Sequence, residues 1–323
     1  MKKFTALLLT FVLLMTLVPV SGLAEETGKI QVVTTIFPIY DWVREVAGDT
    51  GSAEITLLLD SGVDLHSFQP SAQDIMKVAS CDLFIYVGGE SDGWVEDALA
   101  EAVNPDMVVI NLVEALGGNA KAEEIVEGME AEEEEEGEEG EEEEAEIDEH
   151  VWLSLRNAQT FVSAIAGALE TLDPANAEAY KANADAYGAK LAALDAAYTE
   201  AVDSAAFRTL LFGDRFPFRY LTDDYGLTYY AAFVGCSAET EASFRTVIFL
   251  AQKTDELRLP AVMTIEGKDH RIAETVINST TNKDQKLLTL DSMQGTTADD
   301  VANGATYLKI MEDNLAVLKE ALN

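Results

Sequence analysis

Basic side chains are scarce in this chain of 323 residues, in which 21 Lys and Arg stand against 59 Asp and Glu, a formal net charge of −38 at pH 7. Nucleic acids and anionic membranes are bound largely through basic side chains, so this balance argues against both as partners. Hydrophobic residues make up 48% of the chain, which is ample for burial. The length indicates two domains rather than one core.

Cysteine is also scarce, with Cys81 and Cys236 in different halves of the chain. Both lie in apolar stretches, so we expect buried or nearly buried free cysteines rather than a disulfide. No cysteine precedes Cys81, so we expect no lipid anchor on an N-terminal cysteine. Two enzyme signatures are missing as well: there is no H-E-x-x-H, and Gly88-Gly89 lacks the lysine and spacing of a phosphate loop.

Long apolar runs are confined to the N-terminus, where Met1-Lys2-Lys3 precedes an apolar run from Phe4 to about Val20 and small residues up to Ala24. This order predicts a secretory signal peptide over residues 1–24, cleaved after Ala24. A membrane anchor is the alternative, but the run is at the short end for a span. We therefore expect a protein secreted across the cytoplasmic membrane, to the periplasm or the cell surface.

Strands alternate with helices in two series, which indicates parallel βαβ units. Between the series, residues 175–202 form an Ala-rich amphipathic pattern that would span about 40 Å as a helix. We expect an α/β fold of two lobes, each a mostly parallel sheet flanked by helices, joined by one long helix. The predicted lobes are residues 25–172 and 205–323, with the linking helix at 173–204. The predicted strands start near Lys29, Ala53, Asp82, Met107, Thr209, Thr228, Ala261 and Lys286.

Composition changes sharply between Glu123 and Glu149, where 17 Glu and one Asp occur without a Lys or Arg. Such a block cannot bury a core, so it predicts a disordered surface loop over about residues 122–149.

Histidine occurs only three times. His66 lies in D-L-H-S-F-Q-P and His150 in D-E-H-V-W-L, each beside acidic residues, whereas His270 lacks such a setting. Neutral imidazole is a common metal ligand, so the first two predict a metal site. Ligands of open α/β sheets bind at the carboxyl ends of strands, where we expect His66, Asp214 and Asp291.

Several segments resemble the solute-binding receptors of metal-ion ABC transporters, the zinc and manganese class with a rigid linking helix. The likeness runs from about Lys29 to Asn323. It rests on V-V-T-T-I-F-P-I-Y-D, D-L-H-S-F-Q-P-S-A-Q-D-I, D-E-H-V-W-L, D-P-A-N-A, Y-G-L and L-D-S, in this order. Any one segment is weak evidence, but their order and spacing together are specific.

The resemblance implies a metal held between the lobes by four loops, with His66, His150 and Asp291 as ligands. The remaining ligand, His or Glu in the family, falls on Arg215. Arginine has no lone pair to offer. Its charge about 5 Å from a dication would cost roughly 6 to 7 kcal/mol at an effective dielectric of 20. Arg215 must therefore pair with an acid, or the site is rebuilt.

Three acids near Arg215 are candidates for a replacement ligand or for its partner. We favour Glu239 or Asp214 as the ligand, and Glu241 is the third candidate. The family's zinc members often carry a His- and acid-rich loop before the second histidine. The Glu-rich segment here is either a weak collector of cations or a tolerated insertion.

The leading interpretation is a monomeric, non-catalytic binding protein that captures Zn²⁺, or with less support Mn²⁺, and delivers it to an ABC-type permease. One alternative is a degenerate receptor relative, in which Arg215 fills the vacant place and the ligand is a chelate or an anion. A secreted metallohydrolase is a further alternative; it would need an open coordination position and a general base.

Overall fold

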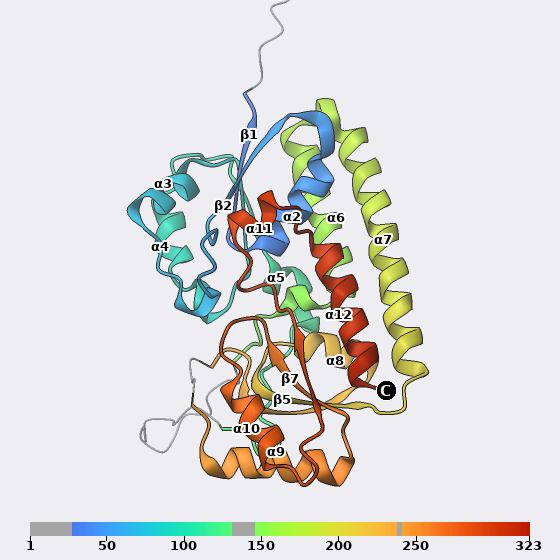
Figure 1. Ribbon diagram of the computed structural model, residues 1–323. Helices are drawn as coiled ribbons and strands as arrows, with labels where there is room; N and C mark the ends of the chain where they lie inside the picture. The colour runs from blue at the N-terminus through green and yellow to red at the C-terminus, as the bar shows by residue number, and fades with distance from the viewer. Residues whose placement is uncertain (1–27, 131–145, 238–240) are drawn as a thin grey trace, which may run out of the picture.

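The computed structural model describes residues 28–130, 146–237 and 241–323. The predicted signal peptide, the centre of the predicted acidic loop and Glu239 lie outside the described residues. Two lobes are stacked end to end, and one long helix runs along the side of both (Figure 1). Within the described residues, no helix combines the length and the hydropathy needed to cross a bilayer.

Each lobe contains a four-stranded parallel sheet, and the two sheets have the same topology. The strand order is β2-β1-β3-β4 in the first lobe and β6-β5-β7-β8 in the second. In both, the order reverses beside the lobe's first strand, which opens a crevice at the carboxyl ends of the strands. The predicted fold class is confirmed. The strands are β1 Ile30–Thr34, β2 Ala53–Leu57, β3 Leu83–Tyr86, β4 Val108–Asn111, β5 Thr209–Phe216, β6 Thr228–Val234, β7 Ala261–Ile265 and β8 Lys286–Leu290.

Helices flank the sheets, so the central strands are buried on both faces, as in β7, where every residue is buried. The short helices α5 and α11 escaped sequence analysis, and β5 extends four residues beyond the predicted Phe212. The helices are α2 Phe37–Ala47, α3 Ala72–Ser80, α4 Val95–Ala100, α5 Leu112–Leu116, α6 Leu155–Leu172, α7 Ala177–Asp203, α8 Arg219–Tyr225, α9 Phe244–Leu257, α10 Arg271–Ser279, α11 Ala298–Ala302 and α12 Tyr307–Ala321.

Helix α7 is the long connection between the lobes, and its tyrosines anchor it at both ends. The Tyr180 hydroxyl lies 2.5 Å from the Ser52 hydroxyl of the first lobe. The Tyr198 hydroxyl donates a hydrogen bond of 2.7 Å to the carbonyl of Met311 in α12. Both rings are fully buried. Packing along its length makes α7 a brace that resists wide separation of the lobes.

The C-terminal segment returns from the second lobe to the first, where α11 and α12 lie beside α2 (Figure 1). The Ala298 amide donates to the Asp60 carbonyl at 2.7 Å. The Trp152 indole donates to the Ser292 carbonyl at 2.9 Å, and the Tyr307 hydroxyl donates to the Trp152 carbonyl. The lobes are therefore joined near the seam as well as by the long helix.

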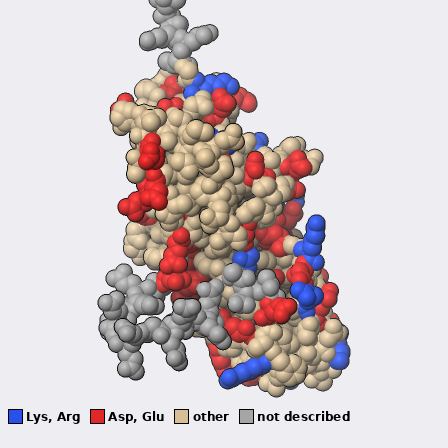
Figure 2. All heavy atoms as spheres, turned by 90° about the vertical axis from the view of Figure 1, so that its left-hand side faces the viewer, with Lys and Arg blue, Asp and Glu red and all other residues tan. Residues whose placement is uncertain are grey.

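The two described ends of the acidic segment are held by backbone pairing. Ala122 and Ile147 form an antiparallel bridge, and Glu130 pairs with Phe233 at the edge of the second sheet. These contacts hold the described residues at both ends of the predicted acidic loop. On the face shown in Figure 2, Asp and Glu outnumber Lys and Arg.

A buried carboxylate on α2 receives the first amide of α12. Asp41 is 1% exposed, and its Oδ2 accepts a hydrogen bond of 2.8 Å from the Tyr307 amide. Burial raises the pKa of Asp41 to about 6, although the Tyr307 amide and the Arg44 charge oppose the shift. The charged form of Asp41 is thus disfavoured in the folded state relative to the unfolded chain.

Asp41→Asn should increase the stability of the protein at neutral pH. The folded pKa is the higher one, so the wild type loses stability as pH rises from about 4 to about 6, whereas the neutral amide does not. We expect the variant to gain about 1 to 3 kcal/mol over the wild type between pH 4 and pH 7. Urea unfolding at the two pH values measures the difference. A difference that does not change with pH would refute the assignment.

Candidate metal centre between the lobes

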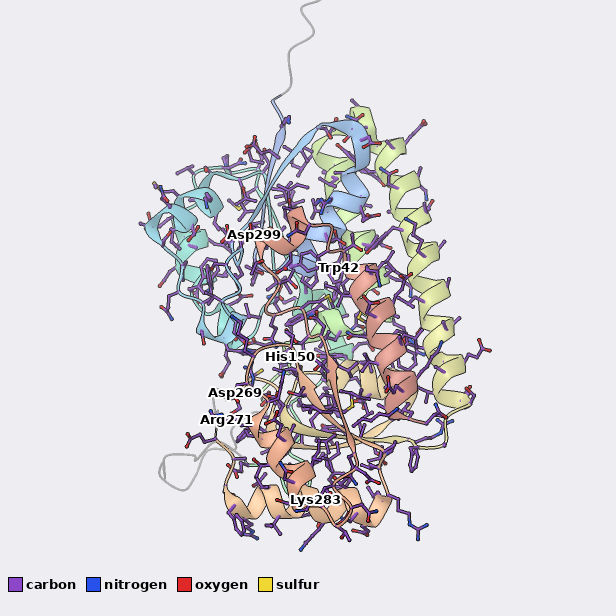
Figure 3. All side chains as sticks on the ribbon, in the orientation of Figure 1. Trp42, His150, Asp269, Arg271, Lys283 and Asp299 are labelled. Atoms are coloured by element: carbon purple, nitrogen blue, oxygen red, sulfur yellow. The ribbon has the colours of Figure 1, made fainter. Side chains whose placement is uncertain are left out.

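Three side chains from three separate segments converge at the seam. His66 lies on the 3-10 turn Leu65–Ser67 after β2, His150 directly precedes the turn Val151–Leu153, and Cys236 follows β6. Each offers one donor atom, and these three atoms lie within 4.8 Å of one another. Figure 3 places His150 in the middle of the molecule, where the two lobes meet. The structure thus brings the two predicted histidines together.

Each histidine is oriented by the aspartate two residues before it. Asp64 Oδ1 lies 2.6 Å from His66 Nδ1 and accepts the His66 amide at 3.0 Å. Asp148 Oδ1 lies 2.9 Å from His150 Nδ1 and accepts the His150 amide at 2.8 Å. An ionised carboxylate only accepts, so Nδ1 carries a proton, and in a neutral imidazole Nε2 is then the nitrogen with the lone pair. Carboxylates play this orienting role behind metal-binding histidines.

The inward-facing atoms of the site have no hydrogen-bond partner. Among the described residues, the buried atoms of this kind include His66 Nε2, His150 Nε2 and Glu149 Oε2. Glu149 Oε2 lies 3.8 Å from His66 Nε2. Leaving a buried polar group unsatisfied costs about 1 to 3 kcal/mol. A cation bound among these atoms would relieve that cost at three points at once.

Arg215, at the end of β5, forms an ion pair with Asp64 across the seam. Its Nη2 lies 2.7 Å from Asp64 Oδ2, and Nη1 donates to the Ser237 carbonyl at 3.3 Å. Burial raises the pKa of Asp64, but the hydrogen bond from His66 and the charge of Arg215 outweigh it and hold the pKa well below its usual range. Arg215 thus pairs with an acid, as one of the two predicted outcomes required. Because Asp64 also holds His66, Arg215 helps to position that imidazole.

Two other predicted site residues, Asp214 and Asp291, are not among the three converging donors. Both oxygens of Asp214 are engaged: Oδ2 accepts from the Thr264 hydroxyl at 2.6 Å and from the Ile265 amide, and Oδ1 accepts from the Arg215 amide. Within the described residues, the group of converging donors includes neither Asp214 nor Asp291. Glu239 lies outside the described residues.

Asp291 faces a cavity of about 700 Å³ that Asp64, Arg215 and Glu266 also line. Its Oδ1 accepts the Met293 amide at 2.7 Å. Burial and the neighbouring charge of Glu266 raise the pKa of Asp291. The Glu266 carboxylate in turn accepts hydrogen bonds from the segment after β8, including the Ser292 hydroxyl and amide. Asp291 therefore borders the seam on the side of the second lobe, so its role as a ligand stays a prediction.

Cys236 is the member of the cluster that sequence analysis missed. It follows the carboxyl end of β6, and its amide donates to Glu123 Oε1 at 3.2 Å. Burial, followed by the negative charges of Glu123, Asp148 and Glu149, raises the pKa of its thiol. The signal in the sequence was its place one residue after Gly235, at the end of a parallel strand. That is the position at which open α/β sheets bind ligands.

Two glycines permit the close approach of backbone to the site. A Cβ on Gly235 would lie 2.8 Å from His150 Cε1 and 2.9 Å from the Phe216 carbonyl oxygen. A Cβ on Gly89, which has a φ of +90°, would collide with the Glu149 carboxylate. Both Glu149 and His150 are therefore packed where a larger neighbour would displace them.

Comparison with known proteins gives consistent matches over nearly the whole chain. The profile of the family described as zinc-uptake complex component A periplasmic, ZnuA, matches residues 32–321. The zinc-binding lipoprotein AdcA of Streptococcus pneumoniae serotype 4 is 32% identical over 320 residues, which is 99% of this chain and 61% of AdcA. The high-affinity zinc uptake system protein ZnuA of Bacillus subtilis is 32% identical over 302 residues, with 93% and 90% covered. The chain thus spans about three fifths of the AdcA relative and most of the ZnuA relative.

Solved structures agree with these matches. The Zn(II)-bound ZnuA-like domain of Streptococcus pneumoniae AdcA superposes with a TM-score of 0.71 at 28% identity, covering 91% of this chain and 99% of that domain. The metal-dependent lipoprotein YcdH of Bacillus subtilis gives a TM-score of 0.73 at 27% identity, with 91% and 99% covered.

Gly235→Ala should weaken metal binding without unfolding the protein. The added methyl group meets the His150 ring and the Phe216 carbonyl, so the imidazole or the segment carrying Cys236 must shift. We expect a loss of affinity of about 10-fold or more, comparable to the loss of an outer partner of a metal ligand. Isothermal titration with Zn²⁺ measures it, and Gly118→Ala, where no atom lies within 4 Å, is the control. Wild-type affinity in Gly235→Ala would contradict the packing argument.

Proposed function

The chain belongs to the zinc-uptake complex component A family, and we propose that it is an extracytoplasmic receptor that binds Zn²⁺ at the seam and delivers it to an ABC-type permease. The observation that carries the proposal is the convergence of His66 Nε2 and His150 Nε2, buried and without hydrogen-bond partners, between the lobes. The AdcA and ZnuA relatives, named as zinc-binding and zinc-uptake proteins, support the choice of zinc.

The mechanism of a receptor needs no chemical step. A tetrahedral zinc with bonds of about 2.0 to 2.3 Å holds its ligand atoms about 3.3 to 3.8 Å apart. The three donor atoms lie within 4.8 Å of one another, so loading requires only a small contraction of the loops. Helix α7 braces both lobes, so we infer that binding orders the seam and shifts the second lobe slightly, without a wide hinge motion.

The degenerate-receptor alternative is less well supported. It requires the Arg215 guanidinium to occupy the place of the missing ligand. Instead, Arg215 is bound to Asp64 and to the Ser237 carbonyl, and the two imidazoles keep free donor atoms. The relatives carry zinc-binding names rather than enzyme names, which supports a binding protein over a metallohydrolase. Secretion, the permease, the monomeric state and any role for Mn²⁺ stay proposals.

Zinc titration of variants tests the central part of this proposal. The wild type should bind one Zn²⁺ per chain, and His150→Ala should lose at least about 100-fold in affinity, more than the loss of an outer partner costs. His270→Ala is the matched control, because His270 Nδ1 lies beside the Thr264 hydroxyl, at 3.0 Å, and not in the donor cluster. Equal affinities in the wild type and His150→Ala would show that zinc does not bind at this site.

Asp291 is tested separately as the acid from the second lobe. If its carboxylate joins the shell on loading, Asp291→Asn should weaken zinc binding by about 10-fold or more. Asp299→Asn removes the same charge at an exposed position nearby and should leave affinity unchanged. If both variants bind zinc like the wild type, Asp291 is not a ligand.

A further inference from the structure

The second lobe has to supply a donor to a metal held at the seam, and the residue expected there cannot do so. Arg215 is paired with Asp64 across the seam and has no lone pair. His66, His150 and Glu149 all belong to the first lobe. Within the described residues, Cys236 is the second-lobe residue whose donor atom lies within 4.8 Å of both imidazole donors.

The backbone around Cys236 is fixed on both sides, and its thiol forms a hydrogen bond with Glu123 at a place where Sγ lies within 4.8 Å of both imidazole donors. Gly235 lies against the His150 ring so closely that a Cβ would come within 2.8 Å of it. Glu123 accepts the Cys236 amide, and Arg215 donates to the carbonyl of Ser237. The short turn that carries Cys236 is therefore held by three contacts. It follows strand β6, it is bound by Glu123 at the start of the acidic segment, and it is bound by Arg215, which also pairs with Asp64.

A second, independent observation indicates a ligand at this place. His150 is 0% exposed and Glu149 is 2% exposed, and each has an inward-facing atom without a hydrogen-bond partner. Burying such atoms beside a thiol is costly unless something binds them together. Imidazole nitrogen, carboxylate oxygen and thiolate sulfur are all ligands of divalent transition metals.

We propose that Cys236 Sγ is the third protein ligand of the metal and replaces the donor that Arg215 cannot provide. This inference rests on the proposed zinc-receptor function and specifies its ligand set. Binding exchanges the S–H bond for a Zn–S bond, and the proton leaves to solvent. A carboxylate takes the fourth position. Glu149 Oε2 lies 3.8 Å from His66 Nε2 but is not one of the three converging donors, so it has to move toward the metal on loading. Two imidazoles, one thiolate and one carboxylate then neutralise the charge of Zn²⁺.

The sulfur atom has a consequence for selectivity. Thiolate is a soft ligand that favours zinc, whereas Mn²⁺ prefers carboxylate, carbonyl and water oxygens. A receptor that binds its metal through Cys236 therefore has a higher affinity for Zn²⁺ than for Mn²⁺. The surrounding acids do not make that distinction, because carboxylates alone bind hard cations as well.

Cobalt substitution tests the proposal directly, because Co²⁺ bound to a thiolate absorbs in the near ultraviolet through sulfur-to-metal charge transfer. The Co²⁺-loaded wild type should show this band, and Cys236→Ser should lack it and bind Zn²⁺ at least about 10-fold more weakly. Cys81→Ser is the matched control, since Cys81 is buried in the first lobe and its thiol donates to the Val78 carbonyl. It should keep the band.

Cys236→Asp should lose part of the preference for Zn²⁺ over Mn²⁺.

The outcomes separate this inference from the function on which it rests. If the wild type binds one Zn²⁺ but shows no charge-transfer band with Co²⁺, and Cys236→Ser binds Zn²⁺ normally, Cys236 is not a ligand and the receptor function stands. If the wild type binds neither metal, the ligand proposal and the receptor function both fail.

Iodoacetamide labelling of the wild type, read by peptide mass spectrometry, needs no variant. At a pH at which the metal-free protein is labelled, Zn²⁺ should protect Cys236 from alkylation, and equal labelling with and without Zn²⁺ would overturn the proposal.

Discussion

The structure depends on one arrangement: two histidines, each held through Nδ1 by an aspartate two residues earlier, direct their Nε2 atoms into a buried seam. The hydrogen bonds of 2.6 and 2.9 Å leave each imidazole a single free lone pair. In the described structure neither Nε2 has a hydrogen-bond partner. Burying these nitrogen atoms without a partner destabilises the protein unless a ligand binds them. The ligand that suits them is a divalent transition metal.

The rest of the fold keeps that seam narrow and correctly aligned. The two sheets repeat one topology, and the segments that follow β2 and β6 carry His66 and Cys236 to the same place. Helix α7, the returning C-terminal segment and the Trp152–Ser292 hydrogen bond resist separation of the lobes. The Arg215–Asp64 ion pair crosses the seam beside the site. Asp64 is shared between Arg215 and His66, so the Arg215 guanidinium helps to fix the carboxylate that orients His66.

Sequence reasoning predicted the parallel sheets, the linking helix and the two histidines, because strand periodicity and the D-x-H settings are local signals. It missed Cys236 because it interpreted the apolar stretch around the cysteine as core, although the cysteine follows a predicted strand, at the end of which open α/β sheets bind ligands. Its candidate partners for Arg215 were Asp214, Glu239 and Glu241, and it missed Asp64, which lies 151 residues away in the chain. The short helices α5 and α11 carry too few residues for a periodic pattern. The metal-ligand roles of Asp291 and Glu239 stay predictions, and Glu239 lies outside the described residues.

Crystals of the zinc-loaded protein, measured at the zinc absorption edge, test the central claim most directly. The account predicts one strong anomalous peak at the seam, about 2.0 to 2.1 Å from both His66 Nε2 and His150 Nε2. A peak held by surface carboxylates, with the two imidazoles still unpartnered, would contradict it.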